Sequence, residues 1–353
     1  VEDTAEIQKV EMKDDVPTGM ILINKKGEFL EDVSLLDSIS GWIAHLFEYI
    51  TGSLKDVTFE VYALEDIKAA DGESDDYYKK DELVDTIITD DTGIARLENL
   101  PLGKYYVKEK ETAEGYVLDA EIREVDLTYR DQNTKVVTFS TDWQNNRQKA
   151  EISVLKTEKD SDRVVEGTVF ALCTKEDITN ADGKVIMDAD TVIEEKATDQ
   201  DGKVVFASDL PVGFTYYVKE TAPAPGFTSE GEMQEFSFTY EDAEKERVSY
   251  AFDFENQATV FEFNKVSLTD GKEVEGAKLQ VTDVDGNLVE EWVSGKEPHI
   301  IKELVVGKKY IMTETQPADG YVTAGSIEFT VKNTGEVQKV EMKTLLPEDM
   351  KAY

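Results

Sequence analysis

A short phrase of the sequence occurs three times, at 105–116, 216–227 and 310–321. Each copy opens with a tyrosine, has a glutamate at its fifth position, and ends in a glycine followed by an aromatic residue. The three glutamates are Glu109, Glu220 and Glu314. Because side chains alternate between the two faces of a β-strand, each glutamate shares a face with the apolar residues before it. An ionised carboxylate is costly to bury among apolar groups, so its presence in three copies requires a chemical reason.

The repeats predict domains in tandem, because a period near 100 residues is too long for a solenoid. Short strands at regular spacing, separated by Gly/Asp turns, indicate all-β sandwiches. The segment 7–13 matches 337–343 almost letter for letter, so we interpret it as the last strand of a preceding domain and the chain as an excised piece of a longer protein. The expected organisation is a terminal strand at 1–15, β-sandwiches at 16–147, 148–257 and 258–345, and a tail at 346–353.

The first domain contains an insert, at about 33–51, that the other two lack. Its apolar residues recur at helical spacing and Gly52 could end the helix, so we expect one helical insert. A helix packed on its own domain is the simpler interpretation, and a partner-binding or membrane-surface helix is the alternative. The segment has no basic face to hold anionic lipid. The apolar residues are Val33, Leu35, Leu36, Ile39, Trp42, Ile43, Leu46, Phe47 and Ile50.

Composition excludes several classes of partner. The 353 residues include 76 Asp and Glu against 38 Lys and Arg, a formal charge of −38, which disfavours nucleic acid and direct contact with an anionic membrane. The single cysteine, Cys173, rules out an internal disulfide, and two isolated histidines do not form a zinc site. No apolar run is long enough to span a membrane. We expect no metal and no cofactor.

The alternation of side chains between the two faces of a strand also places polar residues on the apolar faces of the strands that open and close each domain. The opening strands end in Lys25, Lys156 and Lys265, and two closing strands end in Asn145 and Asn256. Domains one and two should therefore each bring one Lys, one Glu and one Asn into an apolar interior. One interpretation is a buried ion pair with a hydrogen-bonded amide, which stabilises only weakly.

The other interpretation is chemical. Burial lowers the pKa of a lysine and raises that of a glutamate, so both groups can be neutral. A neutral amine is a nucleophile, and a protonated glutamate can polarise the asparagine carbonyl and then pass its proton to the departing ammonia. The product is an amide between the lysine and asparagine side chains, which links the first strand to the last.

The chain resembles the B-type repeat domains of Gram-positive collagen adhesins, also known as prealbumin-like or SpaA-like pilin domains. The resemblance covers nearly the whole sequence. It implies three immunoglobulin-like or prealbumin-like β-sandwiches with spontaneous Lys–Asn isopeptide bonds, Lys25–Asn145 promoted by Glu109 and Lys156–Asn256 promoted by Glu220. The resemblance rests on four motifs: a glycine eleven positions after Lys156 and Lys265, Leu-Pro-x-Gly-x-x-Tyr at 100–106 and 210–217, the Glu-Thr-x-x-x-x-Gly-aromatic signature with one substituted residue in domain one, and the Phe-Glu-Asn ending at 256.

Domain three departs from this pattern, because Thr344 stands where the acceptor asparagine is expected. A hydroxyl cannot accept the lysine in this reaction, so we expect Lys265 and Glu314 to remain an unlinked pair. In the segment before domain one, Asp14 occupies the acceptor position. Related domains use aspartate with loss of water, so Asp14 is expected to be the acceptor of the preceding domain, without its lysine.

Three functions are compatible with these features. The favoured one is a structural stalk segment of a secreted, cell-wall-associated adhesin or pilin-like protein, located on the cell surface, whose partners are the neighbouring domains of the same long protein. The alternative is a module that binds a host matrix protein or glycan, most readily through domain one and its insert. The third is an enzyme such as a glycosidase with paired carboxylates. We expect no enzyme activity beyond the single-turnover formation of the isopeptide bonds.

Overall fold

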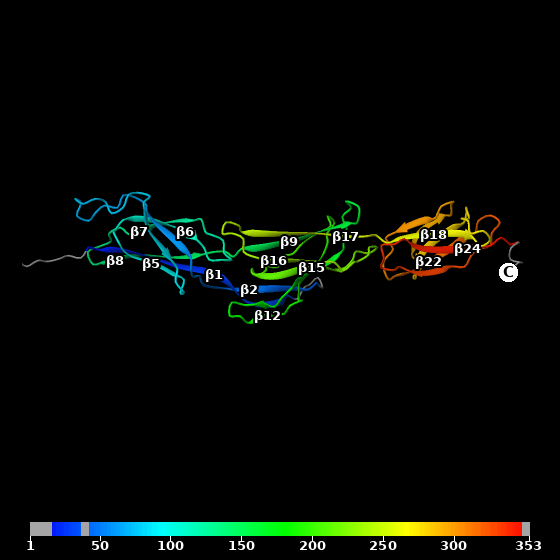
Figure 1. Ribbon diagram of the computed structural model, residues 1–353, viewed down its shortest axis with the longest axis horizontal. Coiled ribbons are helices and arrows are strands. Elements are labelled where there is room, and N and C mark those ends of the chain that lie inside the picture. Colours follow the sequence, from blue (N-terminus) through cyan, green and yellow to red (C-terminus); the bar gives the residue numbers. More distant parts are fainter. Residues whose placement is uncertain (1–15, 37–41, 348–353) are drawn as a thin grey trace, which may run out of the picture.

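The computed structural model describes residues 16–36 and 42–347, and within these ranges every regular element is a β-strand. The predicted all-β class is therefore confirmed. Three β-sandwich domains follow one another along the long axis in chain order (Figure 1). The boundaries 16–147, 148–257 and 258–345 remain predictions and serve below to name domains one, two and three. The predicted terminal strand at 1–15 lies outside the described residues, as does most of the tail.

Each domain packs a three-stranded sheet against a four-stranded sheet. In domain one the sheets have the orders β5 (Ile94–Leu100), β1 (Thr18–Leu36), β8 (Val136–Gln144) and β4 (Leu83–Ile88), β3 (Thr58–Ala63), β6 (Lys104–Glu111), β7 (Ile122–Asp126). In domain two they are β14 (Lys203–Val205), β9 (Lys149–Glu158), β17 (Arg247–Asn256) and β13 (Val192–Ala197), β10 (Val169–Thr174), β15 (Phe214–Ala222), β16 (Met233–Phe238), with a small hairpin of β11 (Ile178–Thr179) and β12 (Val185–Met187).

Domain three repeats the plan with shorter strands. Its sheets have the orders β21 (His299–Lys302), β18 (Val260–Ser267), β24 (Gln338–Thr344) and β20 (Leu288–Val293), β19 (Lys278–Asp283), β22 (Lys309–Gln316), β23 (Ile327–Thr330). Each domain has its own apolar core between its two sheets. In all three domains the first strand pairs with the last in parallel: β1 with β8, β9 with β17 and β18 with β24.

The predicted helical insert is wrong. Residues 26–36 of β1 and the strand β2 (Ala44–Ser53) form a long antiparallel hairpin, in which Val33 lies opposite Phe47. The connection 37–41 lies outside the described residues. The apolar residues of the insert therefore do not form one helical face. Those that lie in the described strands are divided between the two arms of a hairpin, and strand pairing overrides the helical spacing that the sequence suggests.

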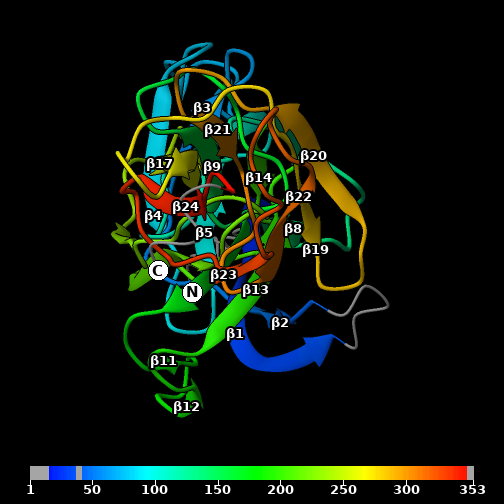
Figure 2. The same cartoon turned by 90° about the vertical axis from the view of Figure 1, so that its right-hand side faces the viewer.

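The hairpin leaves domain one and completes domain two. Beyond Lys26 it projects alongside the neighbouring domain (Figure 1), and it stands out from the side of the molecule in the view along the long axis (Figure 2). Ala44 pairs with Glu194 of β13, so that one sheet runs through both domains. Phe47 is only 3% exposed and belongs to the core of domain two, with Leu30, Val33 and Tyr49 packed beside it. This core is the physical reason for the hairpin, because a helix of the same length could not extend the sheet of domain two.

The other side of the hairpin is also held by domain two. The carbonyl of Leu30 accepts a hydrogen bond from the amide of Ala181 (3.1 Å), and the carbonyl of Glu31 accepts one from Asn180 Nδ2 (3.0 Å). At its base, Arg147 contacts Glu28 Oε2 (3.1 Å) and Asp209 Oδ2 (2.6 Å) and lies over the ring of Tyr49. The hairpin thus joins the two domains through backbone, apolar and ionic contacts.

This arrangement predicts that a residue of domain one stabilises domain two. Phe47→Ala removes a buried ring from the core of domain two, and such changes cost about 3–5 kcal/mol. The measurement is the reaction of Cys173 with a thiol reagent across a urea titration, because this single cysteine is buried in β10 of domain two. We expect Cys173 to become reactive at a lower urea concentration.

Leu46→Ala is the matched control, because Leu46 is the adjacent residue of β2 and is 45% exposed. This change should leave the reactivity of Cys173 nearly unaltered. If Cys173 becomes reactive at the same urea concentration in Phe47→Ala as in the unsubstituted chain, the assignment of the hairpin to the core of domain two is contradicted.

Candidate functional site

The parallel pairing of the first and last strands brings three side chains together in domain one. Lys25 of β1 lies opposite Trp143 of β8, so Asn145, two residues further on, shares the inward face of the sheet. Glu109 extends from β6 in the opposite sheet. Lys25, Glu109 and Asn145 are 0, 4 and 1% exposed, so the three polar groups meet inside the apolar core.

Their contacts form a closed triangle. Lys25 Nζ donates to Glu109 Oε2 (2.6 Å) and to Asn145 Oδ1 (2.5 Å). Asn145 Nδ2 donates to Glu109 Oε1 (2.5 Å) and to Thr112 Oγ1 (2.7 Å). The carboxyl group of Glu109 therefore bridges the amine and the amide with one oxygen on each, as a proton shuttle between them requires.

Domain two repeats the arrangement at the same register. Lys156 lies opposite Phe254, and Asn256 follows two residues later. Lys156 Nζ donates to Glu220 Oε2 (2.9 Å), and Asn256 Nδ2 donates to Glu220 Oε1 (2.9 Å). The glutamate again bridges the lysine and the asparagine, and all three side chains are buried.

Domain three keeps the pair and changes its surroundings. Lys265 Nζ lies 2.8 Å from Glu314 Oε1, close enough for an ion pair, yet the contact lacks hydrogen-bond geometry and neither atom has another hydrogen-bond partner in the described structure. Thr344 occupies the acceptor position, and its hydroxyl donates to the carbonyl of Val322 (2.8 Å). Thr344 is thus committed to the backbone and supplies no carbonyl carbon to the lysine.

Aromatic side chains enclose the two complete sites. Lys25 Nζ lies 5.5 Å from the ring centroids of both Phe59 and Trp143. Lys156 Nζ lies 5.9 Å from those of both Phe170 and Phe254. These rings exclude water from the amine. In domain three the corresponding residues are Leu279, which pairs with Glu314, and Met342, which pairs with Lys265.

The sequence analysis did not identify Phe59 and Phe170 as part of the site. Phe59 and Phe170 pair with Glu109 and Glu220 across the four-stranded sheets, and this pairing follows from the register rather than from a local motif. It also missed Thr112, which contacts the asparagine only in domain one, and Asp119, which accepts a hydrogen bond from Trp143 Nε1 (2.6 Å). The sequence signal that could have identified Phe59 and Phe170 is the alternation of side chains along the strand that pairs with each glutamate strand.

Burial sets the protonation of the lysines. The loss of water around Lys25 lowers its pKa from the usual 10.5, and Glu109 opposes this shift only in part. The pKa of Lys156 is lowered for the same reason, against the attraction of Glu220. A lysine with a lowered pKa is neutral more often, and the neutral amine is the nucleophilic form.

Two observations concern metal binding and membrane insertion. No group of His, Cys, Asp and Glu side chains suited to a metal ion occurs in 16–36 and 42–347. In the same ranges no helix is long and apolar enough to cross a membrane. Asp14, predicted to be an acceptor, lies outside the described residues.

Comparison with known families matches three consecutive segments of the chain. A family model described as "SpaA: Prealbumin-like fold domain" matches residues 49–143, 150–251 and 259–345. The fold is similar to that of the Bacillus anthracis TIE protein, with 23% identity and a TM-score of 0.53 over 93% of this chain and 51% of the other, so the chain spans about half the length of that protein.

Two pilins are more distant matches. BcpA, the major pilin subunit of Bacillus cereus, is 14% identical with a TM-score of 0.42 over 93% of this chain and 99% of the other. The major pilin SpaD of Corynebacterium diphtheriae is 13% identical with a TM-score of 0.33 over 96% of this chain and 100% of the other. No curated protein matches the sequence.

The lowered pKa of Lys25 predicts how stability depends on pH when the acceptor is removed. In Asn145→Ala the amine of Lys25 stays free. Between its lowered pKa and 10.5, the unfolded chain holds a proton that the folded chain has released. The free energy of unfolding should therefore rise with pH through that window, whose upper limit is about pH 10. Urea unfolding at several pH values measures this slope.

The control is Asn145→Ala combined with Lys25→Met, which removes the titrating amine and keeps every other group. The free energy of unfolding of the variant that retains Lys25 should increase with pH relative to that of the double variant. A difference that is flat or decreases with pH would contradict the lowered pKa.

Proposed function

Because the chain belongs to the family of SpaA prealbumin-like fold domains, we propose that it is a stalk segment of a cell-wall-associated adhesin or pilin-like surface protein of a Gram-positive bacterium. In this proposal, intramolecular isopeptide bonds Lys25–Asn145 and Lys156–Asn256 stabilise domains one and two. The observation that supports it most strongly is the bridging glutamate, which contacts the lysine amine with one oxygen and the asparagine amide with the other in both domains.

The reaction follows from these contacts. The neutral Nζ of Lys25 attacks Cγ of Asn145, the Cγ–Nζ bond forms and the Cγ–Nδ2 bond breaks. Glu109 takes the proton that Nζ loses through Oε2 and delivers a proton through Oε1 to Nδ2, which leaves as ammonia. No oxidant or cofactor is consumed. The fixed positions of the three groups supply the effective concentration that amide exchange needs.

The aromatic rings assist the same step. Phe59 and Trp143 keep the lysine dry, which favours its neutral form and strengthens the electrostatic contacts of the site. Thr112 accepts a hydrogen bond from the Nδ2 atom that becomes ammonia, and so orients the amide. Each chain performs each reaction once, so the protein is not an enzyme in the ordinary sense.

The mechanical consequence comes from the parallel strands. Tension enters domain one along β1 and leaves it at the end of β8. A bond between Lys25 and Asn145 passes that tension directly from one strand to the other, so residues 26–144 lie outside the load path. Closing such a loop also stabilises a domain by ~4–5 kcal/mol if the entropy estimate for disulfides applies.

A host-binding function for domain one loses its main basis. The expected free helix is a hairpin, and its residues Val33 and Phe47 face the core of domain two. Within 16–36 and 42–347 the structure singles out no site for a host matrix protein or glycan, and the stalk is the function we propose.

The cross-links predict the mass of the intact protein. Each bond releases one ammonia, about 17 Da by the stoichiometry of amide formation, so the chain should be about 34 Da lighter than its sequence. Glu109→Gln and Glu220→Gln should each restore about 17 Da, because glutamine keeps the shape but cannot shuttle the proton. Mass spectrometry of intact protein and of the linked peptides measures this. A mass equal to that of the sequence would refute the proposal.

Domain three supplies the matched control. Glu314→Gln should change the mass only by the substitution, because Thr344 offers no acceptor. Thr344→Asn should lower the mass by a further ~17 Da, and Thr344→Asn with Glu314→Gln should not. If Thr344→Asn forms no bond, the missing acceptor is not what keeps domain three unlinked.

The stalk function predicts a specific response to force. When the chain is pulled from its two ends in a single-molecule experiment, domain three should unfold and domains one and two should not extend. Glu220→Gln should add a second unfolding event, from domain two, because its first and last strands are then joined only by hydrogen bonds. An extension of domain one or two in the unsubstituted chain would contradict a load path through the cross-links.

A further inference from the structure

The threonine of the signature that follows each glutamate has a different place in domain one. In domains two and three it comes directly after the glutamate, as Thr221 and Thr315. Both residues are exposed, and each hydroxyl donates to a carbonyl of the neighbouring strand (3.3 Å). In domain one, Lys110 takes that place, and the next threonine is Thr112, three residues after Glu109. The threonine of domain one therefore lies beyond the end of its strand, whereas the other two lie within theirs.

This displaced threonine contacts the amide of the acceptor. Asn145 Nδ2 donates to Thr112 Oγ1 (2.7 Å) and to Glu109 Oε1 (2.5 Å), so both hydrogens of the amide nitrogen have an acceptor. In the part of domain two that the structure describes, Asn256 Nδ2 donates to Glu220 and has no second acceptor. The two complete sites therefore differ at the nitrogen atom that leaves as ammonia.

The sequence explains why the other two domains lack this contact. The position that Thr112 holds, three residues after the glutamate, is Pro223 in domain two and Pro317 in domain three. The side chain of proline has no hydrogen-bonding group, so it cannot accept from the amide nitrogen. The contact with the leaving nitrogen is therefore specific to domain one, and domain two of the same chain serves as its internal comparison.

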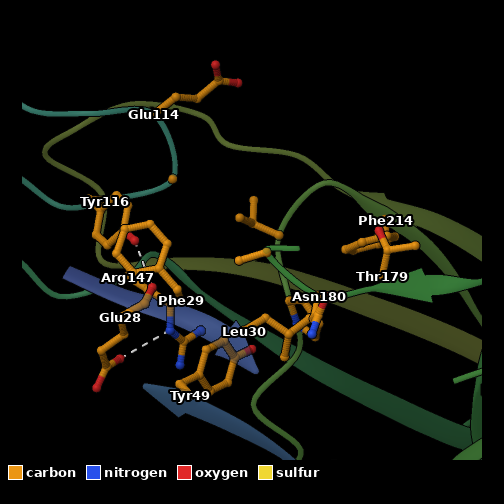
Figure 3. A pocket seen from close by; sticks show the side chains of 14 residues that line it. Glu28, Phe29, Leu30, Tyr49, Glu114, Tyr116, Arg147, Thr179, Asn180 and Phe214 are labelled. Carbon is orange, nitrogen blue, oxygen red and sulfur yellow. Dashed lines mark hydrogen bonds and ion pairs between the residues drawn. The ribbon is translucent and has the colours of Figure 1, made fainter. Parts of the chain in front are cut away.

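The loop that carries Thr112 is held in place from two sides. Further along it, the hydroxyl of Tyr116 donates to the carbonyl of Glu28 on β1 (2.7 Å), and both residues appear in Figure 3. The amide of Val117 donates to the carbonyl of Asn146, the residue directly after the acceptor (2.9 Å). The loop is thus attached to both segments that the cross-link would join, and this fixes the hydroxyl of Thr112 relative to the reacting atoms.

We propose that Thr112 is a catalytic residue for the cross-link of domain one, because its hydroxyl holds the leaving nitrogen. When Nζ of Lys25 adds to Cγ of Asn145, Nδ2 loses its planarity and gains a lone pair that must take a proton from Glu109. Thr112 keeps one hydrogen of Nδ2 in place while the nitrogen turns its lone pair toward Oε1. The Cγ–Nδ2 bond then breaks, ammonia leaves, and Thr112 is unchanged. The inference rests on the proposed isopeptide bond and adds a residue to its mechanism.

The test follows both cross-links in one chain as they form. The full chain is made by cell-free synthesis, samples are denatured in acid at intervals, and mass spectrometry of peptides quantifies the Lys25–Asn145 and Lys156–Asn256 linkages. In Thr112→Val, which removes the hydroxyl and keeps the shape, the linkage of domain one should form about tenfold more slowly, as expected for one hydrogen bond lost from the transition state. Its final extent and the rate in domain two should be unaltered, and complete linking would show that domain one folds.

A second pair of variants separates the hydroxyl from the packing of the side chain. Thr112→Ser and Thr112→Ala both lack the methyl group, and only serine can accept the hydrogen bond. The serine variant should link domain one within about twofold of the original rate and the alanine variant about tenfold more slowly. This ratio decides the question even if valine disturbs the fold. Thr221→Val is the matched control in domain two and should leave both rates unaltered.

The outcomes distinguish this inference from the cross-links themselves. Equal rates in domain one for Thr112→Ser and Thr112→Ala overturn the role of Thr112, although both bonds form. A rate that falls equally in both domains also overturns it, because Pro223 gives domain two no such contact. Absence of both linked peptides from the unsubstituted chain refutes the isopeptide bonds and, with them, this inference.

Discussion

The parallel pairing of the first and last strands is the constraint on which the rest of the structure depends. Neighbouring strands in a parallel pair advance together, so Lys25 and Asn145 reach the same end of the domain on the same face. The opposite sheet then has to supply only the glutamate. The same register recurs in domains two and three, which is why one arrangement of three side chains appears wherever the acceptor is asparagine.

The hairpin of domain one depends on this constraint as well. It leaves the domain just after Lys25, so a Lys25–Asn145 bond excludes the whole hairpin from the load path. A segment free of tension can support its neighbour, and this one does so by placing Phe47 in the core of domain two and extending β13. In the proposed load path, the segment 18–25 that would carry tension and the first arm of the hairpin, 26–36, are thus consecutive parts of β1.

The two-residue alternation of side chains along a strand was sufficient to place the site residues on inward faces. It was not sufficient for the hairpin, whose packing partner lies in another domain. Alternation along single strands placed Lys25, Glu109 and Asn145 on inward faces, and the structure brings these residues together. Phe59, one of the two rings beside Lys25, is placed there by the pairing of β3 with β6, which no local pattern reveals. The hairpin was misread as a helix because the core that buries Phe47 belongs to domain two.

Domain three shows which parts of the site can be lost. Its acceptor position holds threonine and both aromatic positions hold aliphatic or thioether side chains, whereas Lys265 and Glu314 remain. Removing one member of a buried ion pair leaves an uncompensated charge and costs about 3–5 kcal/mol. Replacing the acceptor or the rings leaves both charges paired. Losing either residue of the pair alone would therefore leave a buried unpaired charge, which is a physical reason for Lys265 and Glu314 to occur together where the acceptor position holds threonine.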